Sequence, residues 1–240
     1  NFPKFSHFYL KSPKIFPKFS SFLPNFRPKI VNFYFFSIFA FATCGGFEGS
    51  VTFRVTCEGR ENHTVSAHFG YPFRLHQAVF QPSLTHLCNH TWPKDVHLIG
   101  DFSSAARFFV AVGVASFLYS LGALGGYLGY LHLYRCAGSR LPLMDLVFSG
   151  LVAALWLVAS SAWAQALGHV RAAAAAPLPH CPSPTAVCAH GGTTPMGGLG
   201  ASVAFGFLNL VLWAGGSWFV YKETPLHRPA PPPDSAPSPM

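Results

Sequence analysis

The 240-residue chain has a net charge of +8, and only 10% of its residues are charged whereas 50% are hydrophobic. About a quarter of the residues of a typical soluble domain are charged, so this composition excludes an ordinary soluble protein and predicts one whose solvent is lipid. Six of the sixteen basic residues precede residue 30 and the others are scattered, which argues against a nucleic-acid-binding patch. The charge instead indicates how the chain is oriented in a membrane.

Residues 1–30 form a low-complexity segment. The sequence Phe-Pro-Lys-Phe-Ser occurs at Phe2–Ser6 and again at Phe16–Ser20, and the first residue is not methionine. Such repetition predicts a fragment or a mis-predicted exon. The alternative is a basic and aromatic segment that binds a membrane surface.

Four apolar stretches follow. A helix rises about 1.5 Å per residue and the hydrocarbon core of a bilayer is about 30 Å thick, so about 20 apolar residues make one crossing. Arg107–Tyr134, Asp145–Val170 and Gly198–Tyr221 are long enough, and Val31–Phe47 nearly is. We therefore predict an all-α membrane domain over residues 31–224, built as a bundle of four transmembrane helices.

Two long loops connect the predicted helices, one between the first and second helices and one between the third and fourth. The first, residues 48–106, contains Asn-His-Thr glycosylation sequons at Asn62 and Asn89, and glycans are added on the luminal side. In contrast, the short link after the second helix carries Arg135 and Arg140 without an acid, and short basic loops stay in the cytosol.

This charge pattern sets the predicted topology. Residues 48–106 and 171–197 are expected to be luminal loops, and both chain termini are expected to be cytosolic. Residues 225–240 are Pro-rich and are expected to form a disordered cytosolic tail.

Four of the six cysteines fall in pairs inside the predicted luminal loops, Cys57 with Cys88 and Cys181 with Cys188. The lumen permits disulfides, whereas the cytosol does not. We predict that these pairs bridge the two loops, although six cysteines allow other connectivities. Cys88 also lies between His86 and His90, and because its sulfur is expected to be bridged we predict no metal site and no cofactor.

Small and polar residues in two helices predict where helices pack. Gly-x-x-x-Gly spacings in lipid let two helix backbones approach closely, and a buried amide can bond across helices. The second helix contributes Gly122, Gly126 and Gly129, and the fourth contributes Gly206, Asn209, Trp213 and Gly216. Either these stripes hold one bundle together, or one of them faces another protomer or another protein.

Two further features bear on chemistry. Asp145 starts the third predicted helix, where a carboxylate favours the positive end of the helix dipole, and no second acid lies within a span to form a proton relay. Six histidines crowd the first luminal loop, so a pH-dependent switch is an alternative to simple solvated residues.

Tyrosines and tryptophans lie mostly near predicted helix ends, which is typical of the headgroup region.

Several longer motifs resemble the synaptophysin family. The matching stretches are Phe39–Gly45, Phe69–His76, Leu98–Ser104, Trp156–Val158, Ser161–Ala164, Phe205–Asn209 and Trp218–Thr224. Together they are specific, and the resemblance extends from about Phe39 to His227. Residues 1–30 depart from the family pattern, and the tail lacks the Tyr-Gly-rich repeats of synaptophysin itself, so the partners of that tail are not expected here.

The resemblance implies a MARVEL-type four-helix domain in transport or synaptic-like vesicle membranes, with glycosylated and disulfide-bridged luminal loops. It also implies a role in trafficking and exocytosis, homo-oligomers, and contacts with cholesterol and a synaptobrevin-type vesicle SNARE. No residue is assigned to those contacts.

Other classes are less well supported. The sequence contains no hydrolase, metalloprotease or phosphate-binding motif, so we expect a protein that is not an enzyme. It also lacks the first-loop Gly-Leu-Trp-x-x-Cys pattern of claudins. An oligomeric channel or pore remains the alternative, because glycine and asparagine faces can line a pore.

Overall fold

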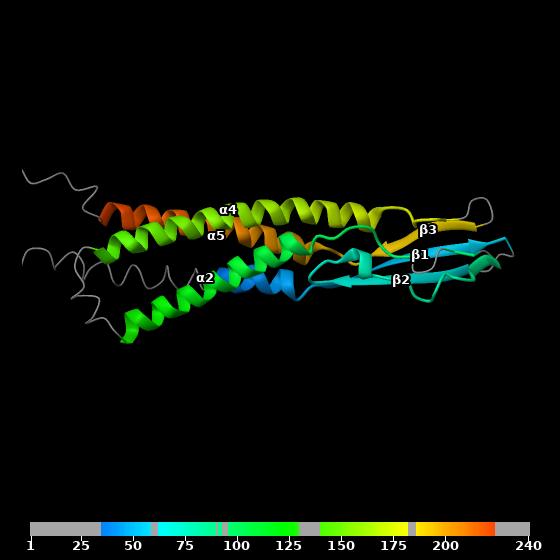
Figure 1. Cartoon of the computed structure of the whole chain (residues 1–240), viewed down its shortest axis with the longest axis horizontal. Coiled ribbons are helices and arrows are strands. Elements are labelled where there is room, and N and C mark those ends of the chain that lie inside the picture. Colours follow the sequence, from blue (N-terminus) through cyan, green and yellow to red (C-terminus); the bar gives the residue numbers. More distant parts are fainter. Residues whose placement is uncertain are drawn as a thin grey trace, which may run out of the picture.

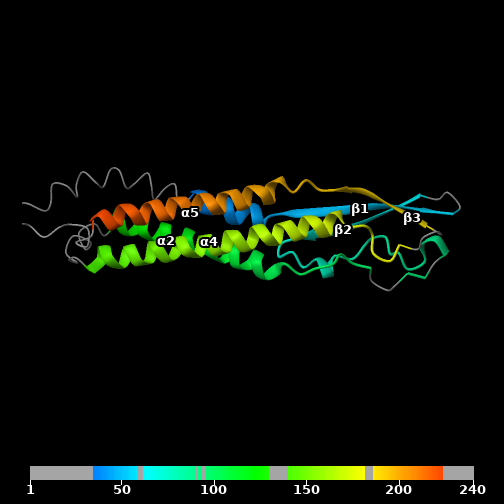
Figure 2. The same ribbon diagram turned by 90° about the horizontal axis from the view of Figure 1, so that it is seen from above.

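The computed structural model describes residues 35–58, 62–89, 91–92, 96–129, 140–181 and 186–223. The expectations for residues 1–30 and 225–240 lie outside the described residues. Figures 1 and 2 show an elongated molecule with helices packed lengthwise in one half and a β-sheet extending from one end of them. Every site discussed below lies in the helix half, in the sheet half or where the two halves meet.

Three helices are long and apolar enough to cross a membrane. They are α2 (Ser103–Gly129), α4 (Arg140–Ala175) and α5 (Gly197–Glu223), and their candidate spans begin at Ser103, Leu143 and Gly197. The sequence predicted all three, with bounds shifted by a few residues. The structure extends α4 farthest beyond its prediction, by five residues at each end.

The first predicted span is described only in part. A shorter apolar helix covers Phe35–Gly45, which corresponds to about 16 Å at the rise of an α-helix and does not by itself cross a bilayer. Residues 31–34 of the predicted helix lie outside the described residues. The described chain therefore supports three spans of the predicted four-helix bundle.

The longest helix joins the two halves of the molecule. With 36 residues, α4 is about 54 Å long and exceeds the hydrocarbon core by several turns. One face of its last turns, at Val170 and Ala174, is buried, and the helix contacts β3 at the sheet end. Figure 1 shows α4 reaching the sheet.

The prediction of an all-α fold is wrong outside the membrane. The two loops predicted as separate luminal segments form one antiparallel sheet from β1 (Glu48–Cys57), β2 (Asn62–Gly70) and β3 (Ala186–Thr193), in the order β2-β1-β3. Strand β1 lies in the centre and pairs with β3, which is more than a hundred residues away in the chain.

Alternation of side chains explains why these residues form strands. In β1 the apolar residues Val51, Phe53 and Val55 are buried, whereas the residues between them are polar and at least partly exposed. Residues at period 2 share one face of a strand. The same alternation in β2, at Val65, Ala67 and Phe69, completes a buried sheet face.

The segment between β2 and α2 covers that buried face. Its buried apolar residues include Phe73, Leu75, Phe80, Leu84, Trp92 and Leu98. Phe80 meets Phe53 edge to face at 5.6 Å. Ser66 and Gln81 also exchange two backbone hydrogen bonds of 2.8 Å, so part of the outer edge of β2 is paired rather than open.

The outer surfaces of the three spanning helices carry large apolar side chains. Exposed examples are Leu118 and Leu121 on α2, Leu151 and Leu155 on α4, and Phe207 and Val211 on α5. Exposed apolar residues at this density would be unfavourable in water. They are the expected surface of helices that face lipid tails.

Candidate functional site

The polar contacts inside the helix bundle begin with Asn209. Its side chain is fully buried, its Oδ1 accepts a hydrogen bond from the Ser37 hydroxyl at 3.2 Å, and its Nδ2 donates to the carbonyl oxygen of Phe205 at 2.8 Å. The first of these bonds joins α5 to the helix Phe35–Gly45. Asn209 therefore lies where the sequence predicts it, in a contact between helices.

Gly206 lies one turn before Asn209 and is also buried. A Cβ atom at this position would lie 2.5 Å from the Ser160 hydroxyl oxygen and 2.7 Å from the ring of Phe109. Only glycine allows α5 to approach α4 and α2 this closely. Gly216 lies further along α5 and is half-buried.

Trp213 belongs to a polar and aromatic contact that the sequence did not predict as a unit. Its buried ring lies 5.8 Å from that of Tyr119 in α2. Tyr119 stacks on Phe148 at 4.2 Å and donates a hydrogen bond of 2.8 Å to Oδ1 of Asp145. Asp145 lies within α4 rather than at its start, and its partner is a phenol on another helix. The one hint in the sequence was a tyrosine inside an otherwise apolar run.

A tryptophan connects the bundle to the sheet half. Trp163 is fully buried and donates from Nε1 to the Ser202 hydroxyl at 2.9 Å. Its ring lies 5.0 Å from Phe73, which comes from the segment covering the sheet, and 6.3 Å from Phe109 in α2. The ring of Trp163 is therefore enclosed by protein and does not lie on the outer surface of the helices.

The packing stripe predicted on α2 differs in its surroundings from the stripe on α5. Gly122 is exposed, and nothing lies within 4 Å of the position that a Cβ would take. Gly126 and Gly129 belong to the part of α2 whose surroundings lie outside the described residues. Figure 1 shows α2 diverging from α4 toward this end. At Gly122, the stripe makes no contact within the described part of the chain.

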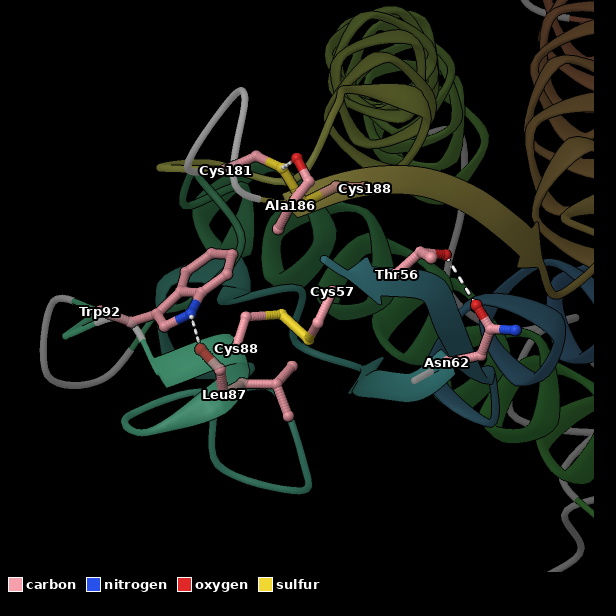
Figure 3. Close-up of a disulfide and its surroundings, with 9 residues drawn as sticks. All are labelled: Thr56, Cys57, Asn62, Leu87, Cys88, Trp92, Cys181, Ala186 and Cys188. Atoms are coloured by element: carbon pink, nitrogen blue, oxygen red, sulfur yellow. Dashed lines mark hydrogen bonds between the residues drawn. A yellow bond between two sulfur atoms is a disulfide. The ribbon is translucent and has the colours of Figure 1, made fainter. Parts of the chain in front are cut away.

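Both predicted cysteine pairs are bonded in the structure. Cys57 is joined to Cys88, with their Cα atoms 5.1 Å apart, and Cys181 is joined to Cys188, with Cα atoms 6.3 Å apart. Residues Val55 and Cys57 at the end of β1 lie opposite Cys188 and Ala186, so both bridges lie at the same end of the sheet (Figure 3). Because Cys88 is bridged, its sulfur is not available to a metal.

The two sequons lie near the same end. Asn62 begins β2, is exposed, and accepts a hydrogen bond from the Thr56 hydroxyl at 2.8 Å (Figure 3). Thr64, the hydroxyl residue of that sequon, is also exposed. Asn89 follows the bridged Cys88, and its side chain lies outside the described residues. Both sequon residues Asn62 and Thr64 are therefore exposed on the surface.

The start of α2 is fixed by an acid. Oδ1 of Asp101 accepts a hydrogen bond of 2.9 Å from the backbone N–H of Ser103, which satisfies one of the N–H groups left open at a helix start. The hydrogen bonds from the side chain and backbone of Ser103 lower the pKa of Asp101 below its usual range. Nδ1 of His76 lies 3.9 Å from the other carboxylate oxygen.

These features describe a membrane bundle with an attached, disulfide-closed sheet. The sequence matches the MARVEL membrane-associating domain over residues 21–219. The chain belongs to the MARVEL family. Family membership agrees with the three apolar spans and the lipid-facing side chains of the bundle. In this MARVEL protein the side chains of Asn209, Tyr119 and Trp163 form hydrogen bonds that join helices to one another.

Proposed function

We propose that this MARVEL protein is a member of the synaptophysin family in transport or synaptic-like vesicle membranes. Within that family, Tyr127–Tyr130 and Leu141–Asp145 resemble pantophysin, the synaptophysin-like protein of non-neuronal vesicles. In this proposal both termini are cytosolic, and the sheet with Asn62 and Asn89 faces the lumen.

Its role is that of a non-enzymatic, oligomeric scaffold in trafficking and exocytosis. One observation carries this proposal: the buried side chains of Asn209 and Trp163 and the half-buried side chain of Tyr119 form hydrogen bonds between helices, while apolar side chains cover the outside of the helices. Such a bundle presents surfaces for lipid and for other membrane helices. Cholesterol and a synaptobrevin-type SNARE are the proposed partners on those surfaces.

The proposed homo-oligomer uses the open side of α2 at Gly122. Replacing Gly122 by Leu leaves room for the new side chain in one chain but blocks a second helix from approaching. Gly150 on α4 is also exposed with open space around it, so Gly150→Leu is a matched control. We expect chemical cross-linking in vesicles to give oligomers of the wild type and of Gly150→Leu, and monomers of Gly122→Leu.

The functional test is capture of the vesicle SNARE from floated vesicles by the tagged full chain. Recovery of synaptobrevin above the level of an unrelated membrane protein with the same tag supports the scaffold. Loss of synaptobrevin with correct flotation contradicts the SNARE contact.

The alternative is an oligomeric channel or pore. It requires polar groups along a path that several chains share, and Asn209 is the strongest polar group at membrane depth. In the structure this amide bonds to Ser37 and Phe205 of its own chain, which favours the scaffold. Single-channel recording of the purified chain in planar bilayers separates the two, because a scaffold gives no unitary conductance.

A further inference from the structure

Ile99 has the most exposed large apolar side chain among the described residues, at 72%. It lies in the segment that leads from the sheet half into α2, four residues before that helix begins at Ser103. Lipid-facing side chains of the spanning helices are less exposed, for example Leu118 on α2 at 57% and Val211 on α5 at 65%. The fold therefore leaves Ile99 with less protein contact than a lipid-facing residue of the bundle.

The exposed position of Ile99 follows from an extended and paired backbone. The N–H of Leu98 donates to the carbonyl oxygen of Ala78 at 3.3 Å. Side chains alternate between two faces along an extended chain, and here Val96 and Leu98 are buried, whereas His97 and Ile99 are exposed. Ile99 therefore lies on the face opposite the core that Leu98 joins.

The turn after Ile99 is also fixed. Gly100 has a φ of +123°, which glycine adopts without strain. Its carbonyl oxygen accepts from the N–H of His76 at 3.1 Å, and the N–H of Phe102 donates to the carbonyl oxygen of Phe73 at 3.1 Å. Backbone bonds on both sides thus hold Ile99 on the outer surface.

Phe102 places this turn beside the end of the helix bundle. Its ring stacks on that of His169 in α4, with ring centres 5.9 Å apart and planes within 6° of parallel. The candidate membrane span of α2 begins at the next residue, Ser103. Figures 1 and 2 show α2 beginning where the two halves of the molecule meet.

Helix α5 gives an independent measure of depth. Near its end, the Trp218 ring lies 6.0 Å from the Tyr221 ring and 5.5 Å from Nζ of Lys222. Exposed aromatic and basic side chains of this kind are typical of the membrane surface. Because about 20 helical residues cross the hydrocarbon, the opposite surface lies near residues 198–202.

The start of α2 reaches the same level. The two helices run in the same direction (Figure 1), and the Phe109 ring lies 2.7 Å from the position that a Cβ of Gly206 would take. Ser103 lies six residues before Phe109, and Gly200 lies six before Gly206, so Ser103 and Gly200 are at similar heights along the bundle. Ile99 therefore lies just outside the hydrocarbon, at the depth of lipid headgroups.

Polar groups beside the turn limit how deep it can go. His76 and Asp101 flank it, with side chains 44% and 47% exposed, and Asp101 is bonded to the start of α2. Charged side chains are costly inside hydrocarbon. The polar groups must therefore remain among the headgroups, and only the apolar side chain can reach the lipid chains.

We propose that Ile99 inserts into the leaflet next to the sheet half and contacts the upper part of the lipid chains. This contact continues the lipid-facing surface of α2, which begins four residues later, and it fixes the height of the sheet half above the bilayer. The proposal requires the helices to cross a membrane. It does not depend on the vesicle, SNARE or oligomer assignments, nor on which side of the membrane the sheet lies.

The first experiment is photochemical cross-linking of the full chain in phosphatidylcholine nanodiscs. The photoreactive residue p-benzoylphenylalanine replaces Ile99, Val211 or Val187 in separate variants. Val211 faces lipid in α5, whereas Val187 is 66% exposed on β3 and pairs with Thr56 at the end of β1 away from the helices. We expect mass spectrometry of the illuminated protein to detect lipid adducts at positions 99 and 211, and none above background at 187.

The second experiment measures the depth of insertion. Ile99→Trp and Val187→Trp are prepared in nanodiscs whose lipids carry bromine, which quenches tryptophan fluorescence on contact, and the wild-type signal is subtracted. We expect quenching only for Ile99→Trp. Bromine near the carboxyl end of the lipid chains should quench it more than bromine near the methyl end. Formation of both disulfides and cooperative thermal unfolding show that each variant is folded.

Two results would overturn the proposal. One is a yield of lipid adduct at position 99 that does not exceed the yield at position 187, together with equal quenching of Ile99→Trp and Val187→Trp. The other is a cross-link from position 99 to a second copy of the chain in place of lipid, which would assign the exposed side chain to a protein interface.

Discussion

The two halves of this MARVEL protein are stabilised in different ways. The sheet half buries large apolar side chains such as Phe53, Phe73 and Phe80 and adds two disulfides, which is how a small domain becomes stable in water. The helix half also buries a few large rings such as Trp163, but it exposes many large apolar side chains and packs its helices through small and polar residues such as Gly206 and Asn209. In lipid, burial of apolar surface does not drive helices together, so close packing and hydrogen bonds do.

This difference predicts that the largest effect comes from the disulfides and is confined to the sheet. Bridges that close 31-residue and 7-residue separations contribute about 4 and about 2 kcal/mol by the chain-entropy argument. Replacing Cys57 and Cys88 by Ser should therefore accelerate amide exchange in β1 and β2 more than replacing Cys181 and Cys188 by Ser does in β3. Hydrogen exchange in nanodiscs measures both effects, and an equal loss of protection in the middle of α4 and α5 would contradict this separation.

The next largest effect is expected on the stability of the helix bundle. Gly206→Leu forces a side chain into Ser160 and Phe109, and overpacking of this kind costs about 3 kcal/mol. We expect a clearly lower midpoint of thermal unfolding in nanodiscs, followed by circular dichroism. Gly150→Leu is the matched control, because Gly150 is exposed with open space around it; a similar loss of stability in both variants would mean that the space around these glycines does not decide the outcome.

A smaller effect is expected from the hydrogen bond between Ser37 and Asn209. Bonds between membrane helices contribute about 1 kcal/mol, so the double-mutant cycle of Ser37→Ala and Asn209→Leu should give a coupling energy of that size. The cycle is measured from unfolding free energies in bilayers or bicelles. Strictly additive effects would show that the two side chains do not stabilise each other.

The smallest effect concerns pH at the start of α2. The folded state lowers the pKa of Asp101, so ionised Asp101 stabilises the fold above its unfolded pKa, and this contribution is lost as the pH falls through the lowered value. The exchange rates of the first amides of α2 in the wild type and in Asp101→Asn should differ by a constant factor from about pH 7 to about pH 5 and converge only below about pH 4. Glu58→Gln, which alters an exposed acid outside this helix start, should show no such trend. Convergence already at about pH 6 would contradict this account, because a carboxyl group with a lowered pKa is still ionised there.

Much of the bundle was predictable because the length of an apolar stretch can be read from consecutive residues of the sequence. The three spans and both cysteine pairs follow from the sequence alone. The residues Asn209 and Gly206 were also predicted as contacts, since a polar or small residue is conspicuous in an apolar helix. The interhelical partners Ser37 and Ser160 were not predicted, because a single serine in a span can face any neighbour.

The sheet was the main error, and its cause is physical. The alternation of Val51, Phe53 and Val55 is visible in the sequence, as is that of Val65, Ala67 and Phe69. However, the partner strand β3 contains two alanines and two glycines among its eight residues and lies beyond two spanning helices. Its pairing with β1 is decided only when α4 and α5 bring both loops to one end of the bundle. The hydrogen bond between Tyr119 and Asp145 depends on the same long-range arrangement.

The most direct test of the account is a glycosidase experiment on sealed vesicles that contain the full chain. If the three spans cross the membrane and the sheet faces the lumen, glycosidase should change the mobility of the protein only after detergent opens the vesicles. The glycan should be absent when both Asn62 and Asn89 are replaced by Gln. A mobility change in sealed vesicles would place the sheet on the cytosolic side, and a chain that carries no glycan in floated vesicles would contradict the luminal sheet on which the proposed function depends.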